Sequence, residues 1–79
     1  MMRVTVKLFG TLRRLSSEGT PGVWQGEIPE QSRISDLIIL LGTKEAEVAA
    51  AMLNNEPCEL DAEISDGSVV VLVTPFGGG

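Results

Sequence analysis

Three consecutive glycines, Gly77, Gly78 and Gly79, end the sequence and give it its clearest chemical potential. Glycine has more backbone freedom to lose on folding than any other residue, so we expect residues 77–79 to be a flexible tail on a domain of residues 1–76. A backbone without Cβ atoms can enter a channel too narrow for any side chain. The terminal carboxylate would then reach a buried site in another protein.

A carboxylate is a poor electrophile, so that of Gly79 would need activation. Its attack on the α-phosphate of ATP would give an acyl adenylate, and a sulfur nucleophile could then displace AMP and leave a thiocarboxylate. The thiocarboxylate sulfur is a good nucleophile for an acceptor in a second protein. This chemistry predicts a carrier or co-substrate rather than an enzyme. ATP would be used by the activating enzyme, and we expect no cofactor bound to this chain.

Apolar residues near the tail indicate how a partner would hold it. Pro75 has no backbone N–H to donate, so it should end the preceding strand, and Phe76 follows where the tail leaves the domain. An apolar anchor at this point would fix the entry of the tail into a channel, and Phe9 and Leu12 can extend the same patch. The predicted partner-binding residues are Gly77, Gly78, Phe76, Pro75, Phe9 and Leu12.

Other reactive side chains are few. The single cysteine, Cys58, has no histidine to pair with, so we interpret it as structural filler or a half-exposed side chain. One cysteine without histidine also predicts no metal site and no internal disulfide. Asp61 and Glu63 form an acid pair, but we expect a solvated loop there, because so small a domain offers no cleft for acid–base catalysis.

The sequence is acidic overall, and its charge is unevenly distributed. Its net charge of −5 disfavours nucleic-acid and anionic-membrane partners, since both need clustered cations. Arg3, Lys7, Arg13 and Arg14 lie in a first stretch without acids, whereas no base follows Lys44. The acidic second half is either ordinary solvated surface or a face that steers a basic partner.

The N-terminus and the hydropathy pattern bear on localisation. Residues 1–5 lack the charged and apolar regions of a signal peptide, and no apolar run approaches the about 20 residues that a membrane-spanning helix needs. A lone cysteine fits a reducing compartment. We therefore expect a soluble, cytoplasmic protein, and its 79 residues correspond to one small domain.

The first half of the sequence predicts two strands and a helix. Residues 3–9 alternate between apolar and polar side chains, and residues 23–28 can form a second strand antiparallel to the first. Residues 32–41 have apolar side chains at helical spacing, with Ser32 as the N-terminal cap. Gly42 can take the left-handed conformation that ends such a helix.

The second half predicts turns around a buried strand. Residues 44–53 are ambiguous, because their propensity favours a helix while the following Asn54-Asn55 turn could close a hairpin. Asp66-Gly67 is a further turn signal. The continuous apolar run at residues 69–73 predicts a strand buried on both faces and paired with the N-terminal strand.

Several segments, in this order and at this length, resemble the MoaD/ThiS family of ubiquitin-like sulfur carriers. The resemblance covers nearly the whole chain: residues 4–13 are similar to the first strand and following turn of the family, residues 34–41 to its helix, residues 52–56 to a strand and turn, residues 65–70 to the turn into the last strand, and the Gly-Gly end to its reactive terminus.

The resemblance implies an α+β architecture of the β-grasp type, with a mixed sheet packed on one main helix. It also favours a strand over a helix at residues 48–53. It implies adenylation by a ubiquitin-activating-like adenylyltransferase, with sulfur supplied by a persulfide and delivered by the thiocarboxylate of Gly79.

The two branches of the family differ in the acceptor. A MoaD-like protein is the small subunit of molybdopterin synthase, inserts its tail into the large subunit and serves molybdenum or tungsten cofactor synthesis. A ThiS-like protein donates sulfur for the thiazole of thiamine, with thiazole synthase as its partner. The front half with residues 9–13 is more like MoaD, whereas the Phe76-Gly77 ending is closer to some ThiS proteins. We expect the MoaD-like role first and the ThiS-like role as the alternative.

Two further functions remain compatible with the sequence. A protein modifier would be joined through Gly79 to lysines of other proteins, by the same chemistry up to the adenylate. A plain β-grasp binding module would carry its glycine end by coincidence.

Overall fold

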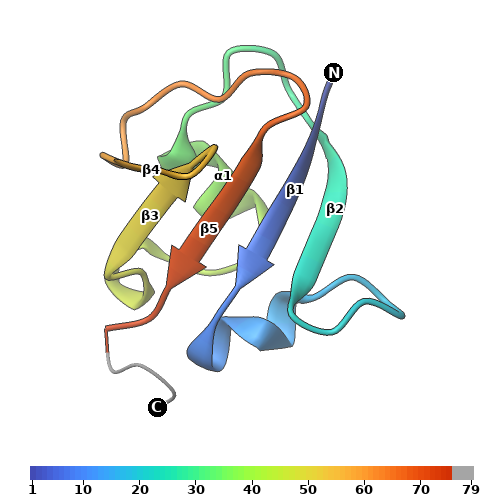
Figure 1. The fold of residues 1–79 in the computed structure, drawn as a ribbon, viewed down its shortest axis with the longest axis vertical. Coiled ribbons are helices and arrows are strands. Elements are labelled where there is room, and N and C mark those ends of the chain that lie inside the picture. The colour runs from blue at the N-terminus through green and yellow to red at the C-terminus, as the bar shows by residue number, and fades with distance from the viewer. Residues whose placement is uncertain (76–79) are drawn as a thin grey trace.

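The computed structural model of the protein describes residues 1–75 (Figure 1), so Phe76, the three tail glycines and the predicted domain boundary lie outside the described residues. The elements, in chain order, are β1 (Met2–Leu8), the 3₁₀ helix η1 (Gly10–Leu15), β2 (Val23–Ile28), α1 (Ile34–Leu40), the 3₁₀ helix η2 (Glu45–Glu47), β3 (Ala50–Leu53), β4 (Glu56–Cys58) and β5 (Val69–Val73).

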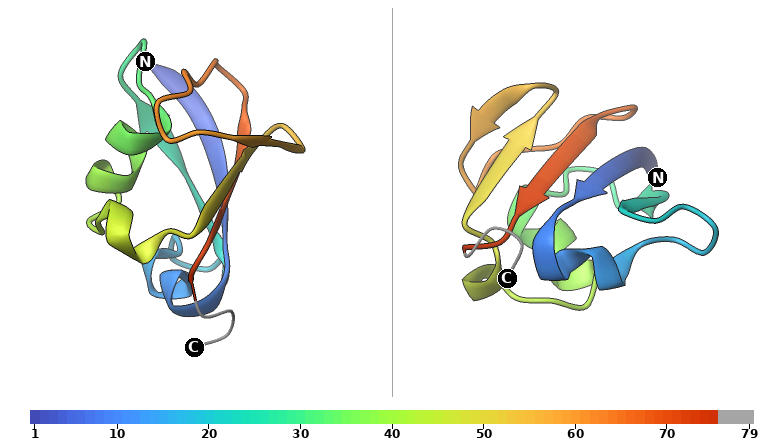
Figure 2. Two further views of the ribbon diagram at one scale, coloured as in Figure 1. Left: turned by 90° about the vertical axis from the view of Figure 1, so that its left-hand side faces the viewer. Right: turned by 60° about the horizontal axis from the view of Figure 1, so that its bottom comes forward.

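The strands form one five-stranded mixed sheet in the order β2-β1-β5-β3-β4. The central pair, β1 and β5, is parallel, and the other neighbouring pairs are antiparallel. The α1 helix covers one face of this sheet (Figure 2, left). The predicted α+β class, with a mixed sheet packed on one main helix, is confirmed.

The alternation in β1 separates a core face from a solvent face, as predicted. Val4, Val6 and Leu8 are almost inaccessible to solvent, whereas Arg3 and Lys7 on the opposite face are exposed. β1 pairs with β2 in the predicted antiparallel hairpin. The buried side chains of both strands pack with those of α1 in a single core.

The α1 helix begins at Ile34 rather than at Ser32. The backbone N–H of Arg33 donates to Oδ2 of Asp36 at 2.9 Å, which closes the first turn. The predicted cap by Ser32 is wrong, because its buried hydroxyl donates at 2.7 Å to a carbonyl oxygen of the preceding turn instead. Gly42 has a φ of +95°, so the predicted left-handed end of the helix is confirmed.

The ambiguous segment at residues 44–53 contains η2 followed by β3, so the strand favoured by the resemblance is confirmed for its second part. Asn54 and Asn55 have φ values of 51° and 73° and form the predicted turn into β4. Asn54 also binds β5: its N–H donates to the carbonyl oxygen of Val69 at 2.8 Å, and its Oδ1 accepts from the Val69 N–H at 2.8 Å. One residue therefore fixes the hairpin against the central strand.

Asp66 and Gly67 form the predicted turn before β5 and attach it to β1. Oδ1 of Asp66 accepts a hydrogen bond from the Arg3 N–H at 2.7 Å, and the Gly67 N–H donates to the Arg3 carbonyl oxygen at 2.8 Å. These bonds bring the start of β5 beside the start of β1, which parallel pairing requires.

The prediction that β5 is buried on both faces is wrong. Val70 and Leu72 are fully buried on the side of α1, whereas Val69, Val71 and Val73 are only half-buried on the other side. Within residues 1–75, no helix covers that second face (Figure 2, left). The run of valines belongs to a central strand that has only one face in the core. On the other face, the valines are explained by the preference of β-branched residues for strands.

Trp24 packs against the core from the edge strand β2, and its ring lies over Gly26. A Cβ atom at Gly26 would stand 2.7 Å from Cη2 and 2.8 Å from Cζ2 of the Trp24 ring, which is closer than side chains tolerate. The glycine therefore makes room for the indole within the strand.

We predict that Gly26→Ala lowers the free energy of unfolding by about 1–3 kcal/mol, because the indole must move out of its packed position. Urea denaturation followed by circular dichroism measures this change. In the background of Trp24→Leu the same substitution should cost much less, since the ring is gone. An equal cost in both backgrounds would contradict the role assigned to the indole.

Asn54→Ala should lower the free energy of unfolding by about 1–3 kcal/mol, because the acceptor for the Val69 N–H is lost and alanine is strained at positive φ. Asn54→Gly is the matched control: it loses the same acceptor but tolerates the backbone conformation. The glycine variant should be the more stable of the two by thermal unfolding. The reverse order would show that positive φ at this turn carries no cost.

Candidate functional site

The candidate site is the end of the sheet at which the central strands β1 and β5 both finish. Below, this end of the sheet, and not an outer strand, is meant by the edge from which the tail leaves. Because the two strands are parallel and Leu8 is in register with Leu72, their C-terminal ends lie side by side. In Figure 1 the arrowhead of β5 lies between η1, in blue, and η2, in yellow-green. We call residues 72–75 the tail root, since this segment leads from β5 to the predicted glycine tail.

Backbone hydrogen bonds hold the tail root from both sides. The N–H of Phe9 donates to the carbonyl oxygen of Leu72 at 3.2 Å, and the N–H of Ala49 donates to that of Val73 at 2.7 Å. Thr74 is buried, with 5% of its surface exposed, and Pro75 is exposed. The chain is thus fixed in the sheet as far as Val73 and reaches solvent at Pro75, where the absence of an N–H ends strand pairing as predicted.

The predicted apolar patch is present only in part. Phe9 is 50% exposed beside the tail root, and the exposed Pro75 lies at the same edge, so both are accessible to a partner. The prediction for Leu12 is wrong, because this residue has no exposed surface. Gly10, at a φ of 64°, starts η1 immediately after the Phe9 position, and this turn directs Leu12 into the core.

Four of the predicted site residues lie outside the described part of the chain. They are the reactive residue, the two glycines before it and the aromatic residue that precedes them: Gly79, Gly78, Gly77 and Phe76. Their predicted roles remain predictions.

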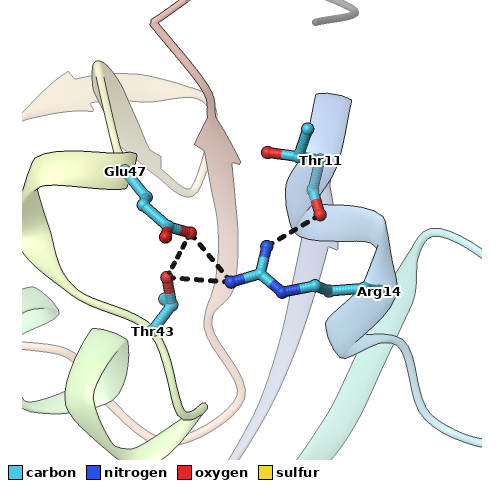
Figure 3. Close-up of polar contacts among 4 residues, drawn as sticks. All are labelled: Thr11, Arg14, Thr43 and Glu47. Atoms are coloured by element: carbon cyan, nitrogen blue, oxygen red, sulfur yellow. Dashed lines mark hydrogen bonds and ion pairs between the residues drawn. The ribbon is translucent and has the colours of Figure 1, made fainter.

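A polar cluster, not predicted from the sequence, connects the two short helices beside the tail root (Figure 3). Nη2 of Arg14 on η1 lies 2.8 Å from Oε1 of Glu47 on η2, and Nη1 donates to the carbonyl oxygen of Thr11 at 3.0 Å. The hydroxyl of Thr43 donates to the same Glu47 oxygen at 2.8 Å. The only sequence signal was the position of Arg14 in a stretch without acids and of Glu47 in one without bases.

The pKa of Glu47 lies below its usual value, chiefly because its carboxylate accepts hydrogen bonds from Arg14 and Thr43. Glu47 is therefore ionised at neutral pH. A carboxylate held in this way is a structural acceptor and a poor general base.

Cys58 is no candidate nucleophile. It lies on β4, and its half-buried side chain packs against the core, so the prediction of a filler or half-exposed side chain is confirmed. Burial, with a smaller contribution from Glu59, raises the pKa of its thiol, which disfavours the reactive thiolate. Within residues 1–75, no group of three or more acidic or cysteine side chains is arranged to hold a metal ion. None of the described helices is long and apolar enough to cross a membrane.

Comparison with solved structures identifies the fold as β-grasp. A protein of Pyrococcus furiosus named as molybdopterin converting factor subunit 1 superposes with a TM-score of 0.71 at 24% identity, over 95% of this chain and 99% of the other. Small archaeal modifier protein 1 of Haloferax volcanii superposes with a TM-score of 0.73 at 14% identity, over 95% of this chain and 99% of the other. A further structure of that Haloferax protein gives 0.68 at 18% identity, over 98% and 99% of the two chains.

The sequence itself gives a family. No curated protein matches the chain. Its sequence does match the profile of the ThiS family over residues 6–79, which includes both the tail root and the glycine end. The match covers nearly the whole chain and agrees with the fold, so the chain belongs to the ThiS family of ubiquitin-like sulfur carriers.

Proposed function

We propose that the protein is a sulfur carrier that is adenylated at the carboxylate of Gly79 and then converted to a thiocarboxylate. The observation that carries this proposal is the family match, which extends to residue 79. The tail root supports it, because the chain is anchored at Val73 and directed to solvent at Pro75. A partner can therefore take the end of the chain without unfolding the domain.

The proposed reaction proceeds in two group-transfer steps. A carboxylate oxygen of Gly79 attacks the α-phosphorus of ATP, the acyl–phosphate bond forms, and pyrophosphate leaves. A persulfide sulfur then attacks the acyl carbon and expels AMP. A second thiol cleaves the resulting acyl disulfide, which leaves the thiocarboxylate on the carrier and oxidises the two thiols to a disulfide.

The described part of the chain supplies the scaffold for these steps and leaves the chemistry to partners. Members of the family generally act as small non-catalytic carriers. The first partner is a ubiquitin-activating-like adenylyltransferase, which uses ATP. Phe9 and Pro75 are the exposed apolar residues at the edge from which the tail leaves, and they would contact the rim of its channel.

For the acceptor, the favoured partner is the large subunit of molybdopterin synthase, with the present chain as the small subunit. The similarity in fold to the Pyrococcus molybdopterin converting factor supports this branch. The match to the ThiS family supports the alternative of sulfur donation to thiazole synthase. The similarity in fold to the Haloferax modifier protein supports a third role, conjugation through Gly79 to other proteins.

Co-purification separates these branches. The chain is expressed with a tag at its N-terminus, so that the tail stays free, and partners are identified by mass spectrometry. We expect the large subunit of molybdopterin synthase. Recovery of thiazole synthase instead would favour the thiamine branch, and isopeptide-linked adducts through Gly79 would favour the modifier.

We predict that deletion of Gly78 and Gly79 abolishes ATP–pyrophosphate exchange by the adenylyltransferase, with a loss of about 100-fold or more, because the attacking carboxylate is no longer in reach. Deletion of the exposed Met1 is the control and should leave the exchange unchanged. Thermal unfolding should be the same for both variants and the parent. Exchange that survives the loss of Gly78 and Gly79 would favour a plain binding module.

A further inference from the structure

The two short helices at the edge of the sheet determine where the last hydrogen bonds of β5 lie. η1 directly follows Phe9, whose N–H donates to the carbonyl oxygen of Leu72. η2 is followed by Val48 and then Ala49, whose N–H donates to the carbonyl oxygen of Val73. η1 also contacts β5 directly. A displacement of either helix would therefore move a donor away from the tail root.

Arg14 is the side-chain link between these helices. Its planar guanidinium donates through Nη1 to the Thr11 carbonyl oxygen within η1 and through Nη2 to Glu47 on η2 (Figure 3). Nη2 also lies 3.5 Å from Oγ1 of Thr43, in the loop after α1. Within residues 1–75, no other ion pair joins η1 to η2.

We propose that Arg14 is a positioning residue for the C-terminal tail: by holding η1 against η2 it fixes the direction in which the chain leaves the sheet at Pro75. The inference rests on the proposed function, because the direction of the tail matters only if a partner must receive it. Arg14 acts through the two helices and their backbone donors and does not itself react.

Geometry favours positioning over a general contribution to stability. Arg14 is 49% and Glu47 35% exposed, and exposed ion pairs add little to the free energy of folding. The contact is nevertheless short and branched, with Glu47 bound by two donors. Within residues 1–75, the ion pair of Arg33 with Glu63 is longer at 3.7 Å, and its glutamate is more exposed, at 63%.

A small change of angle at the base of the tail produces a large displacement at its tip, which is how one contact can affect the proposed reaction. A segment of four residues spans at most about 14 Å when extended. A swing of about 20° at its base would thus displace its tip by about 5 Å, whereas reacting atoms must come within about 3.5 Å of each other. A fixed base reduces the volume that the tip must search before it enters a channel.

The first test measures the tail root alone, by amide hydrogen exchange in Arg14→Gln. We expect the Phe9 and Ala49 amides to exchange about three- to tenfold faster, while the Ile64 amide, which bonds to Ser32 at the far end of the domain, stays unchanged. Arg33→Gln is the matched control, because Arg33 is also 49% exposed and paired with a glutamate. It should leave Phe9 and Ala49 unchanged.

The second test measures the partner's response. With the adenylyltransferase, Arg14→Gln should raise the KM for the carrier about three- to tenfold and leave kcat unchanged, since the carboxylate and the enzyme are intact. Arg14→Lys keeps the positive charge but lacks the planar group that donates to several acceptors at once. Its KM should therefore lie between those of the parent and Arg14→Gln. Arg33→Gln should behave like the parent.

The two tests separate failure of the inference from failure of the proposed function. Absence of adenylation in the parent protein would refute the function, and with it the inference. Normal adenylation of the parent with unchanged exchange at Phe9 and Ala49, or with an unchanged KM in Arg14→Gln, would overturn the inference alone. Uniformly faster exchange at all amides would overturn it too, because it would show only a loss of global stability.

Discussion

The parallel hydrogen bonding between β1 and β5 determines the point at which the chain leaves the sheet after β5. Thr5 is in register with Val69 and Leu8 with Leu72, so the last strand runs through the centre of the sheet and leaves it at the edge where β1 turns into η1. A last strand at the border of a sheet would end with a free side and a loosely held exit. Here both neighbours donate hydrogen bonds to the final carbonyl oxygens, and the exit is fixed.

The core makes this central position stable. Val6 and Val70 are paired across the two strands and are fully buried with Leu72 beneath α1. Burial of each such side chain contributes about 1.5–3 kcal/mol to the free energy of folding. The same burial keeps water away from the backbone hydrogen bonds between the two strands. On the opposite face of β5, the described part of the chain places no helix, so the valines there are only half-buried. The core on one face and the backbone hydrogen bonds from both neighbours together hold the C-terminal end of β5 in the sheet.

Local sequence patterns predicted the parts of the structure that local physics controls. Alternation in β1, the turn at Asn54 and the turn at Asp66 depend on neighbouring residues, and each was predicted correctly. Leu12 was not, because its burial depends on the turn that the chain makes at Gly10, where η1 begins after β1. The contact between Arg14 and Glu47 was also missed, since it joins residues 33 positions apart that only the folded chain brings together.

If the end of this chain accepts sulfur, the intact mass of the protein must rise. The protein is incubated with its adenylyltransferase, ATP, a persulfide donor and a thiol, and the mass is measured before and after. We expect an increase of about 16 Da, the exchange of one oxygen for sulfur, confined to the C-terminal peptide at Gly79. An unchanged mass under conditions in which an established carrier reacts, or sulfur located at Cys58 instead, would contradict it.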